Sequence, residues 1–326
     1  PLVLTNLLQV LFNMADIAVI GQFAGALSLG AVGSTTTLVT LFTGVLIGMA
    51  GGINVLVARY FGARDKTSTV HTIHTALLVS LITGIIVLAF GMIFSKGILE
   101  IMNTKEELLN GAVLYIRIYF LGMPALALYN FGNAVCSAFG DTKKPLYYLS
   151  AAGVVNVVLN LFFVIVCKMD VAGVATASII SQYLSAFLIL RALAKMGGDY
   201  ALRLSELKFD KRMAKYIIQI GLPAGLQNGI FQLANLFIQA GVNTFDATMV
   251  AGNSAAANAD ALLYDSMAAF YTACGSFMGQ NYGAGKRKRV KNSYLISLAY
   301  SFGIGLVGGI CLVIFGRQFL GLFTND

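Results

Sequence analysis

The sequence predicts an all-α membrane protein, a polytopic helical bundle, and three observations carry this prediction. Hydrophobic residues make up 58% of the 326 residues and charged residues only 11%, which is less than half of their share in soluble domains. Apolar segments of about 20 residues, the length that crosses a bilayer, follow one another along the chain. The pattern of the first segments also returns, with changes, in the last ones.

Nine segments are long and apolar enough to be transmembrane helices, and short connections rich in glycine and charged residues separate them. They lie at about 1–22, 30–58, 72–95, 108–138, 145–167, 171–193, 212–241, 248–281 and 293–316. The longest connection, about 194–211, mixes leucines with charged residues. We expect a short helix there that lies on the membrane surface.

An internal repeat divides the chain into two lobes. The segment around Gly62 returns around Gly283, at an offset of 221 residues, and Pro1 corresponds to Pro223 at an offset of 222. Six spans return the chain to its starting side, so the two copies form a parallel repeat. We expect a first six-helix lobe at 1–200 and the first three helices of a second, incomplete lobe at 201–326. The full protein should then have twelve spans, with further residues at both ends.

Basic residues predict the orientation of the bundle. The connections after the second, fourth, sixth and eighth spans hold 17 of the 22 Lys and Arg residues. The positive-inside rule places these connections in the cytoplasm. We expect the protein in the plasma membrane, which in a bacterium is the inner membrane. The formal net charge of +8 is therefore interpreted as a topology signal, and we expect no nucleic-acid partner.

Motifs of other function classes are missing from the sequence. The four cysteines stand singly, and no CxxC pair indicates a metal site or a disulfide framework. The segment Gly283–Lys286 fails as a phosphate loop, because Gln280 and Arg287 replace the required Gly and Ser or Thr. We expect no enzymatic activity and no cofactor, and either an ion gradient or another chain as the energy source for transport.

Polar residues inside the predicted spans are the candidate functional residues, because such groups are costly in lipid. One face of the first span carries Asn6, Gln9, Asn13 and Asp16, and the seventh span repeats the amides with Asn228, Gln232, Asn235 and Gln239. Ile238 stands where the repeat would place a second acid. We expect the amides of both spans to line one polar cavity and Asp16 to couple transport to an ion. Hydrogen bonds between helices are the alternative role of the amides.

Three more spans carry polar groups. Asn156 and Asn160 lie one turn apart in the fifth span, and the sixth span carries Thr176, Ser178, Gln182 and Ser185. Their oxygens can bind Na⁺ or hydrogen-bond a carboxylate, and contacts between helices are again the alternative. In the eighth span, Asp260 shares a face with Tyr264, a combination that suits an organic cation. A place near a helix end, or pairing with a basic group such as Arg117, is the alternative for Asp260 and its neighbour Asp265.

Several segments together resemble the multidrug and toxic compound extrusion (MATE) family of antiporters. They are Asn13–Asp16 with Ile20 and Gly21, Tyr60–Ala63, Asn156–Asn160 with Val171–Ala177, Gly221–Pro223, and Gly279–Gly285. The resemblance implies twelve helices in two lobes around a V-shaped cavity, and export of cationic amphipathic compounds in exchange for H⁺ or Na⁺. It places the first-helix acid of the family at Asp16, its fifth-helix pair at Asn156 and Asn160, and its sixth-helix threonine at Thr176.

The sequence departs from the family pattern at two positions. Asn160 stands where one branch has a second acid in the fifth helix, and Phe231 stands where another branch has a glutamate after the seventh-helix proline. Asp16 is left as the best candidate for ion coupling, by H⁺ or by Na⁺ bound at its carboxylate.

The predicted function is a cation-coupled antiporter that exports cationic drugs or toxins by alternating access. Its partners would be small organic cations and the lipid bilayer, and we expect a monomer. A lipid-linked saccharide flippase is one alternative, although its anionic cargo would require several basic residues inside the cavity. A membrane assembly protein without transport activity is the other, and the polar stripes in both lobes argue against it.

Overall fold

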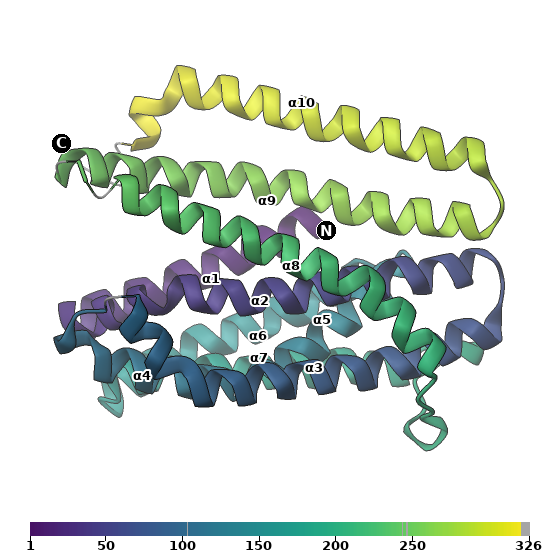
Figure 1. The fold of residues 1–326 in the computed structure, drawn as a ribbon, viewed down its shortest axis with the longest axis horizontal. Coiled ribbons are helices and arrows are strands. Elements are labelled where there is room, and N and C mark those ends of the chain that lie inside the picture. Colours follow the sequence, from purple (N-terminus) through teal and green to yellow (C-terminus); the bar gives the residue numbers. More distant parts are fainter. Residues whose placement is uncertain (103, 243, 246, 321–326) are drawn as a thin grey trace.

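The computed structural model describes residues 1–102, 104–242, 244–245 and 247–320, and they form a helical bundle without strands. Ten α-helices follow one another along the chain. They are α1 (Leu2–Phe23), α2 (Gly25–Gly62), α3 (Lys66–Ile101), α4 (Glu106–Phe120), α5 (Met123–Ala138), α6 (Lys143–Leu161), α7 (Asp170–Ala194), α8 (Lys211–Val242), α9 (Ala247–Gly283) and α10 (Arg287–Leu320). The predicted fold class is confirmed (Figure 1).

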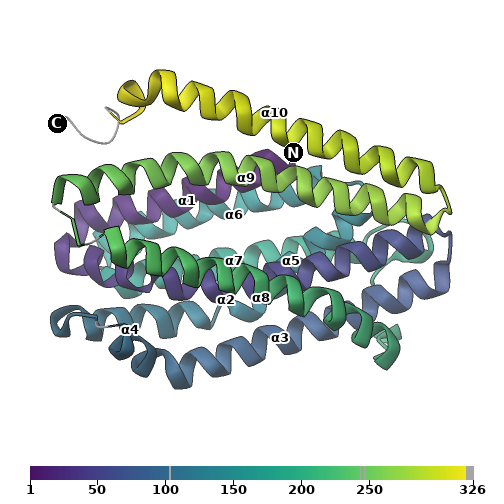
Figure 2. The same cartoon turned by 45° about the horizontal axis from the view of Figure 1, so that its top comes forward.

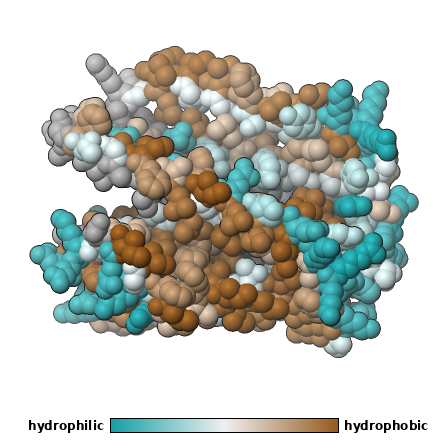
Figure 3. Space-filling view, viewed as in Figure 1, coloured by the Kyte–Doolittle hydropathy of each residue, from teal (hydrophilic) through white to brown (hydrophobic). Residues whose placement is uncertain are grey.

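Each of the nine predicted spans is occupied by one long helix or one broken pair. Within the described part of the chain, six helices are long and apolar enough to cross a membrane, or seven spans if α4 and α5 count as one. The helices α8 and α9 have 32 and 37 residues but a lower apolar content, because they carry many of the polar candidates. Hydrophilic residues gather at the two ends of the bundle and hydrophobic ones between them (Figure 3).

The fourth predicted span is broken in its middle. The axes of α4 and α5 differ by 46°, and Leu121 and Gly122 form the turn between the two helices. Pro124 lies at the start of α5, where a proline is tolerated because its missing N–H would have no partner in the helix. The fifth span also ends irregularly, with a π-helix at Phe162–Val166 directly after α6.

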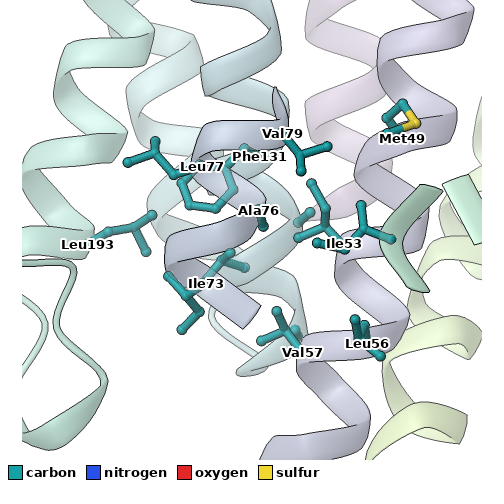
Figure 4. Packing of buried hydrophobic residues seen from close by; sticks show 14 of the residues in the cluster. Met49, Ile53, Leu56, Val57, Ile73, Ala76, Leu77, Val79, Phe131 and Leu193 are labelled. Carbon is teal, nitrogen blue, oxygen red and sulfur yellow. The ribbon is translucent and has the colours of Figure 1, made fainter. Parts of the chain in front are cut away.

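The hydrophobic core lies mainly within α1–α7, which we call the first lobe. One cluster of buried residues joins α2, α3, α5 and α7, and includes Ile53, Ile73, Phe131 and Leu193 (Figure 4). A second cluster joins α1, α2, α3, α4 and α7. The start of α8 also belongs to the first cluster, through Ile217. The division into lobes at about residue 200 stays a prediction.

The helices α8 and α9 lie against one side of the first lobe, and α10 packs on the outer side of α9 (Figures 1 and 2). The helices α2 and α8 approach each other closely, because glycines let the two backbones touch. A Cβ atom added to Gly48 would lie 2.1 Å from the backbone nitrogen of Gly225. One added to Gly52 would lie 2.7 Å from that of Gly221. Glycine is therefore required at these positions, as at other close helix contacts in membranes.

The connection between α7 and α8 differs from the expected surface helix. It contains two short 3₁₀ turns, Gly198–Tyr200 and Leu204–Glu206, and it packs against α3. Leu202 is buried in the core of the first lobe. The backbone N–H of Arg203 donates to Nε2 of His74 at 3.4 Å. The expectation was wrong for two reasons. Leu202 is buried against the protein, and backbone groups of the segment form hydrogen bonds with α3, so the segment is held against the first lobe.

Candidate functional site

Three helices of the first lobe bring polar side chains together around Asp16. Asp16 lies on α1, and its Oδ1 atom accepts a hydrogen bond from Nδ2 of Asn160 on α6. The other carboxylate oxygen, Oδ2, lies 3.4 Å from the donating hydroxyl of Ser178 on α7. Both oxygens of the carboxylate therefore have a donor from a different helix.

Asn156 closes this group into a network of four residues. Its Oδ1 atom accepts a second hydrogen bond from Nδ2 of Asn160 at 3.2 Å, and its own Nδ2 lies 3.5 Å from the hydroxyl of Ser178. The two asparagines share a face of α6 because four residues make about one helical turn. We call Asp16, Asn156, Asn160 and Ser178 the Asp16 network. Its last three members are buried.

No positive charge compensates the carboxylate of Asp16 within the part of the chain that the structure describes. The ion pairs found there do not involve Asp16, and Arg117 of α4 is exposed. Tyr115 and Tyr119 of α4, whose ring centroids lie 5.9 Å apart, add no positive charge. A carboxylate without a counter-charge in such surroundings is costly when ionised, and binding of a proton or cation relieves this cost.

One oxygen of the network has no partner of its own. Oδ1 of Asn160 is buried and accepts no hydrogen bond from the described residues. If the amide of Asn160 were turned around, this oxygen would face the carboxylate of Asp16 and the two would repel each other. The carboxylate therefore determines that the NH₂ group of Asn160 faces Asp16. The network thus combines a carboxylate, two amide oxygens and a hydroxyl. Hard cations such as Na⁺ bind oxygen ligands of this kind, and a carboxylate also binds a proton, so the residues fit both coupling ions.

In the sixth predicted span, the residue expected to take part in ion coupling is Thr176, but the residue that contacts Asp16 is Ser178, two positions further along α7. The hydroxyl of Thr176 donates to the carbonyl oxygen of Ala172 in its own helix at 2.7 Å, whereas Ser178 contacts Asp16. A role of Thr176 in ion coupling stays a prediction without a contact to the acid. Ser178 could have been found by spacing, because it shares a face with Gln182 and Ser185.

The amide stripes of α1 and α8 join helices at two of their positions. Nδ2 of Asn6 donates to the backbone oxygen of Asp265 on α9 at 2.9 Å, and Nδ2 of Asn228 donates to that of Gly44 on α2 at 3.3 Å. These bonds support the alternative role of helix contact for the two residues. Gln9 and Asn235 are exposed and Gln232 is half-buried, while the side chains of Asn13 and Gln239 lie outside the described residues.

The second-lobe candidates are not part of the Asp16 network. Asp260 is exposed on α9, and Asp265 is half-buried. Tyr264 stacks on Phe231 of α8, with ring centroids 5.8 Å apart and an angle of 12° between the planes. The sequence did not indicate this aromatic pair, because the two residues are 33 positions apart and only the arrangement of α8 and α9 brings them together.

Comparisons with known proteins agree with the geometry. The family model described as MatE matches residues 1–162 and 223–326. The chain is 30% identical over 332 residues to "Probable multidrug resistance protein YpnP" of Bacillus subtilis, covering 100% of this chain and 73% of that protein. It is 26% identical to "FAD transporter" of Shewanella oneidensis, covering 97% and 70%.

A solved structure has the same fold. It is described as the outward-facing conformation of a multidrug resistance MATE family transporter, and it superposes with a TM-score of 0.91 at 24% identity, over 99% of this chain and 72% of that one. The family match covers most of the chain, and members of this family are multi-pass membrane transporters. This chain therefore belongs to the MatE family.

Proposed function

We propose that the protein is a cation-coupled antiporter that exports cationic amphipathic compounds, and that the Asp16 network is its ion-coupling site. The observation that carries the proposal is the carboxylate of Asp16, held by neutral donors on α6 and α7 and without a basic partner among the described residues. A site of this kind can gain and lose a single positive charge. A permanent salt bridge could not.

The coupling follows from differential binding. When the cavity is open to the outside, Asp16 takes up H⁺ or Na⁺ and loses its net charge, which favours release of a cationic substrate. When the cavity is open to the cytoplasm, Asp16 gives up the ion and the site again attracts a cation. Ion and substrate must favour different states or compete for one charge for this exchange to occur.

The charge of the spans supports a cationic substrate. Away from the ends of the predicted spans, the acids are Asp16, Asp260 and Asp265 and the basic residue is Arg117; Arg191, Arg212 and Lys215 lie at span ends, beside the basic connections. Anionic cargo with phosphate groups would be expected to need several arginines or lysines. The relative named as a multidrug resistance protein agrees with this choice. We further propose that the basic connections face the cytoplasm and that a single chain is the transporting unit.

The decisive experiment compares Asp16→Asn with Asp170→Asn in the full-length protein. Asp170 is exposed at the start of α7 and has a positive φ of 46°, a conformation that asparagine also tolerates. Ethidium efflux should be lost in the Asp16 variant and kept in the Asp170 variant, at equal amounts in the membrane. Collapsing the proton and sodium gradients separately then identifies the ion. Unchanged efflux in Asp16→Asn would contradict the proposal.

A further inference from the structure

The helices α2 and α9 cross each other near the ends that carry the basic connections, and they do so with reciprocal contacts. A Cβ atom added to Gly62 would lie 2.0 Å from the backbone oxygen of Gln280, and one added to Gly283 would lie 1.9 Å from that of Arg59. Gly62 corresponds to Gly283 in the repeat, and Arg59 to Gln280, both at an offset of 221. The same contact is therefore made twice, as across the two-fold axis of a symmetric dimer.

A polar pair joins the two helices beside these backbone contacts. Asn54 of α2 and Ser276 of α9 are 222 positions apart, one position away from exact correspondence in the repeat. The Ser276 hydroxyl oxygen lies 3.0 Å from Nδ2 and 3.1 Å from Oδ1 of Asn54. Both residues are buried. Nδ2 of Asn54 also donates to the backbone oxygen of Ala134 on α5 at 3.0 Å.

Two more contacts join α9 to the first lobe beside this pair. Nε2 of Gln280 donates to the backbone oxygen of Ala138 at 2.6 Å, and the guanidinium carbon of Arg59 lies 5.4 Å from the ring centroid of Tyr282. The crossing thus consists of backbone contacts, hydrogen bonds and one cation–π contact.

The crossing separates Asp16 from the basic side of the bundle. Asn54 is eight residues from the end of α2, or about 12 Å along the helix, and α2 ends at the basic connection. Asp16 is seven residues from the opposite turn, where α1 ends at Phe23. Asp16 and the Asn54–Ser276 pair therefore lie in different halves of the membrane thickness, with the crossing on the cytoplasmic side of the acid.

We propose that the α2–α9 crossing is the cytoplasmic gate of the transport path, and that Asn54 and Ser276 are the positioning residues that hold it closed. This inference rests on the proposed antiport function. Opening toward the cytoplasm requires the two helices to separate at this point, and water can then take over the hydrogen bonds at a small net cost. Glycines stand where the two helices approach most closely, at Gly62, Gly279 and Gly283, and a glycine has no side chain to expose when the helices separate.

The α2–α8 contact is suited to the opposite role. Its glycines continue into the buried apolar residues Ile53 and Ile217, and exposing such residues to water would be costly. We assign the moving contact to α2 and α9 and the lasting one to α2 and α8. If α2 and α9 stayed in contact throughout the transport cycle, their crossing would be a point of rotation and not a gate. A covalent cross-link between the two helices distinguishes these roles, because it blocks transport only if the helices must separate.

The test is a reversible cross-link in the full-length protein, with the four cysteines of this chain and any others in the protein replaced by alanine. A Cβ atom added to Gly279 would lie 2.9 Å from Cβ of Ala58, so a small shift reaches the separation of about 3.5–4.5 Å found in disulfides. With Ala58→Cys and Gly279→Cys combined, oxidation should lower efflux at least about tenfold, and reductant should restore it. Equal efflux in the oxidised and reduced forms would overturn the gate. Each single variant with oxidant is the control.

Labelling provides a readout that needs neither transport nor the double variant. Ser276→Cys should react with a membrane-impermeant maleimide on the cytoplasmic side, at a rate that changes about tenfold or more between conditions that load and unload Asp16. Asn281→Cys, on the same helix but at a side chain that bonds only within α9 among the described residues, should react equally in both. A Ser276→Cys thiol that stays unreactive in both conditions would overturn the gate. If the labelling rate of Ser276→Cys changes between the two conditions but the reduced double variant shows no efflux, the proposed antiport function is contradicted and the gate is not.

Discussion

Replacing Asn160 by leucine tests the chemistry of the Asp16 network most directly. The Nδ2 atom of Asn160 donates to the carboxylate of Asp16 and to Oδ1 of Asn156. Leucine is similar in size but donates nothing, so Asp16 keeps only the donor on Ser178, at 3.4 Å. A hydrogen bond to a charged group contributes about 1.5–3 kcal/mol. The ion-free form of Asp16 should be disfavoured by this amount, which is about a ten- to hundredfold change in its equilibrium with the ion-loaded form.

The direction of the effect differs between the two coupling ions. If H⁺ is the ion, the neutral carboxyl is favoured, and the half-maximal point of efflux should move by about 1–2 pH units toward higher pH. If Na⁺ is the ion, the amide oxygen of Asn160 is lost as a ligand, and half-maximal efflux should require more Na⁺. One variant therefore tests the site and identifies the ion.

The assay is initial ethidium efflux at a series of pH values and Na⁺ concentrations, from cells that lack other efflux pumps. Asn281→Leu is the matched control, because the amide of Asn281 donates only to Phe277 in its own helix. Membrane content is compared by immunoblot. Wild-type pH and Na⁺ profiles in Asn160→Leu, at normal membrane content, would refute a coupling role for the network.

Three further predictions concern the contacts around the site. Ser178→Ala should lower efflux severalfold more than Thr176→Val, because Ser178 and not Thr176 contacts Asp16; equal effects in the efflux assay would contradict this. Gly48→Ala should reduce the amount of folded protein and its melting temperature, because overpacking typically costs about 1–3 kcal/mol and the added methyl meets the backbone of Gly225; an unchanged melting curve in detergent would argue against the close α2–α8 approach. Leu202→Ala should release the segment between α7 and α8, because truncating a buried leucine costs about 2–5 kcal/mol. The released segment should be cleaved faster by a protease. Leu204→Ala is the control, because Leu204 is exposed.

The bundle itself could be predicted from the sequence because the bilayer restricts the chain so strongly. Every backbone polar group must be satisfied within lipid, so an apolar segment of sufficient length has the helix as its solution. For this reason the nine predicted spans correspond to the observed helices, including the pair α4 and α5 in the single span 108–138. The interruption inside that span was not predicted, since one proline after Gly122 is compatible with a bent or a broken helix.

The members of the candidate site could be named only in part. Asp16 stood out because an acid within an apolar span is costly, and Asn156 and Asn160 followed from their spacing of one turn. Ser178 was present in the polar set of its span but was not distinguished from Thr176. Hydroxyls on a helix can bond their own backbone, as Thr176 does, and composition alone does not reveal which one turns toward another helix.

The sequence by itself determined that the chain forms long apolar helices and that an isolated acid lies in the first of them, because these features depend on local hydrophobicity and charge; the direction of the crossings and the division into two lobes stay predictions. Only the tertiary structure decided which donors surround Asp16, that Asn6 and Asn228 join helices, and that Asn54 meets Ser276 where α2 and α9 cross. Such contacts join residues that are up to 259 positions apart. They depend on how the helices rotate and cross, and the periodicity of one helix carries no information about its partner.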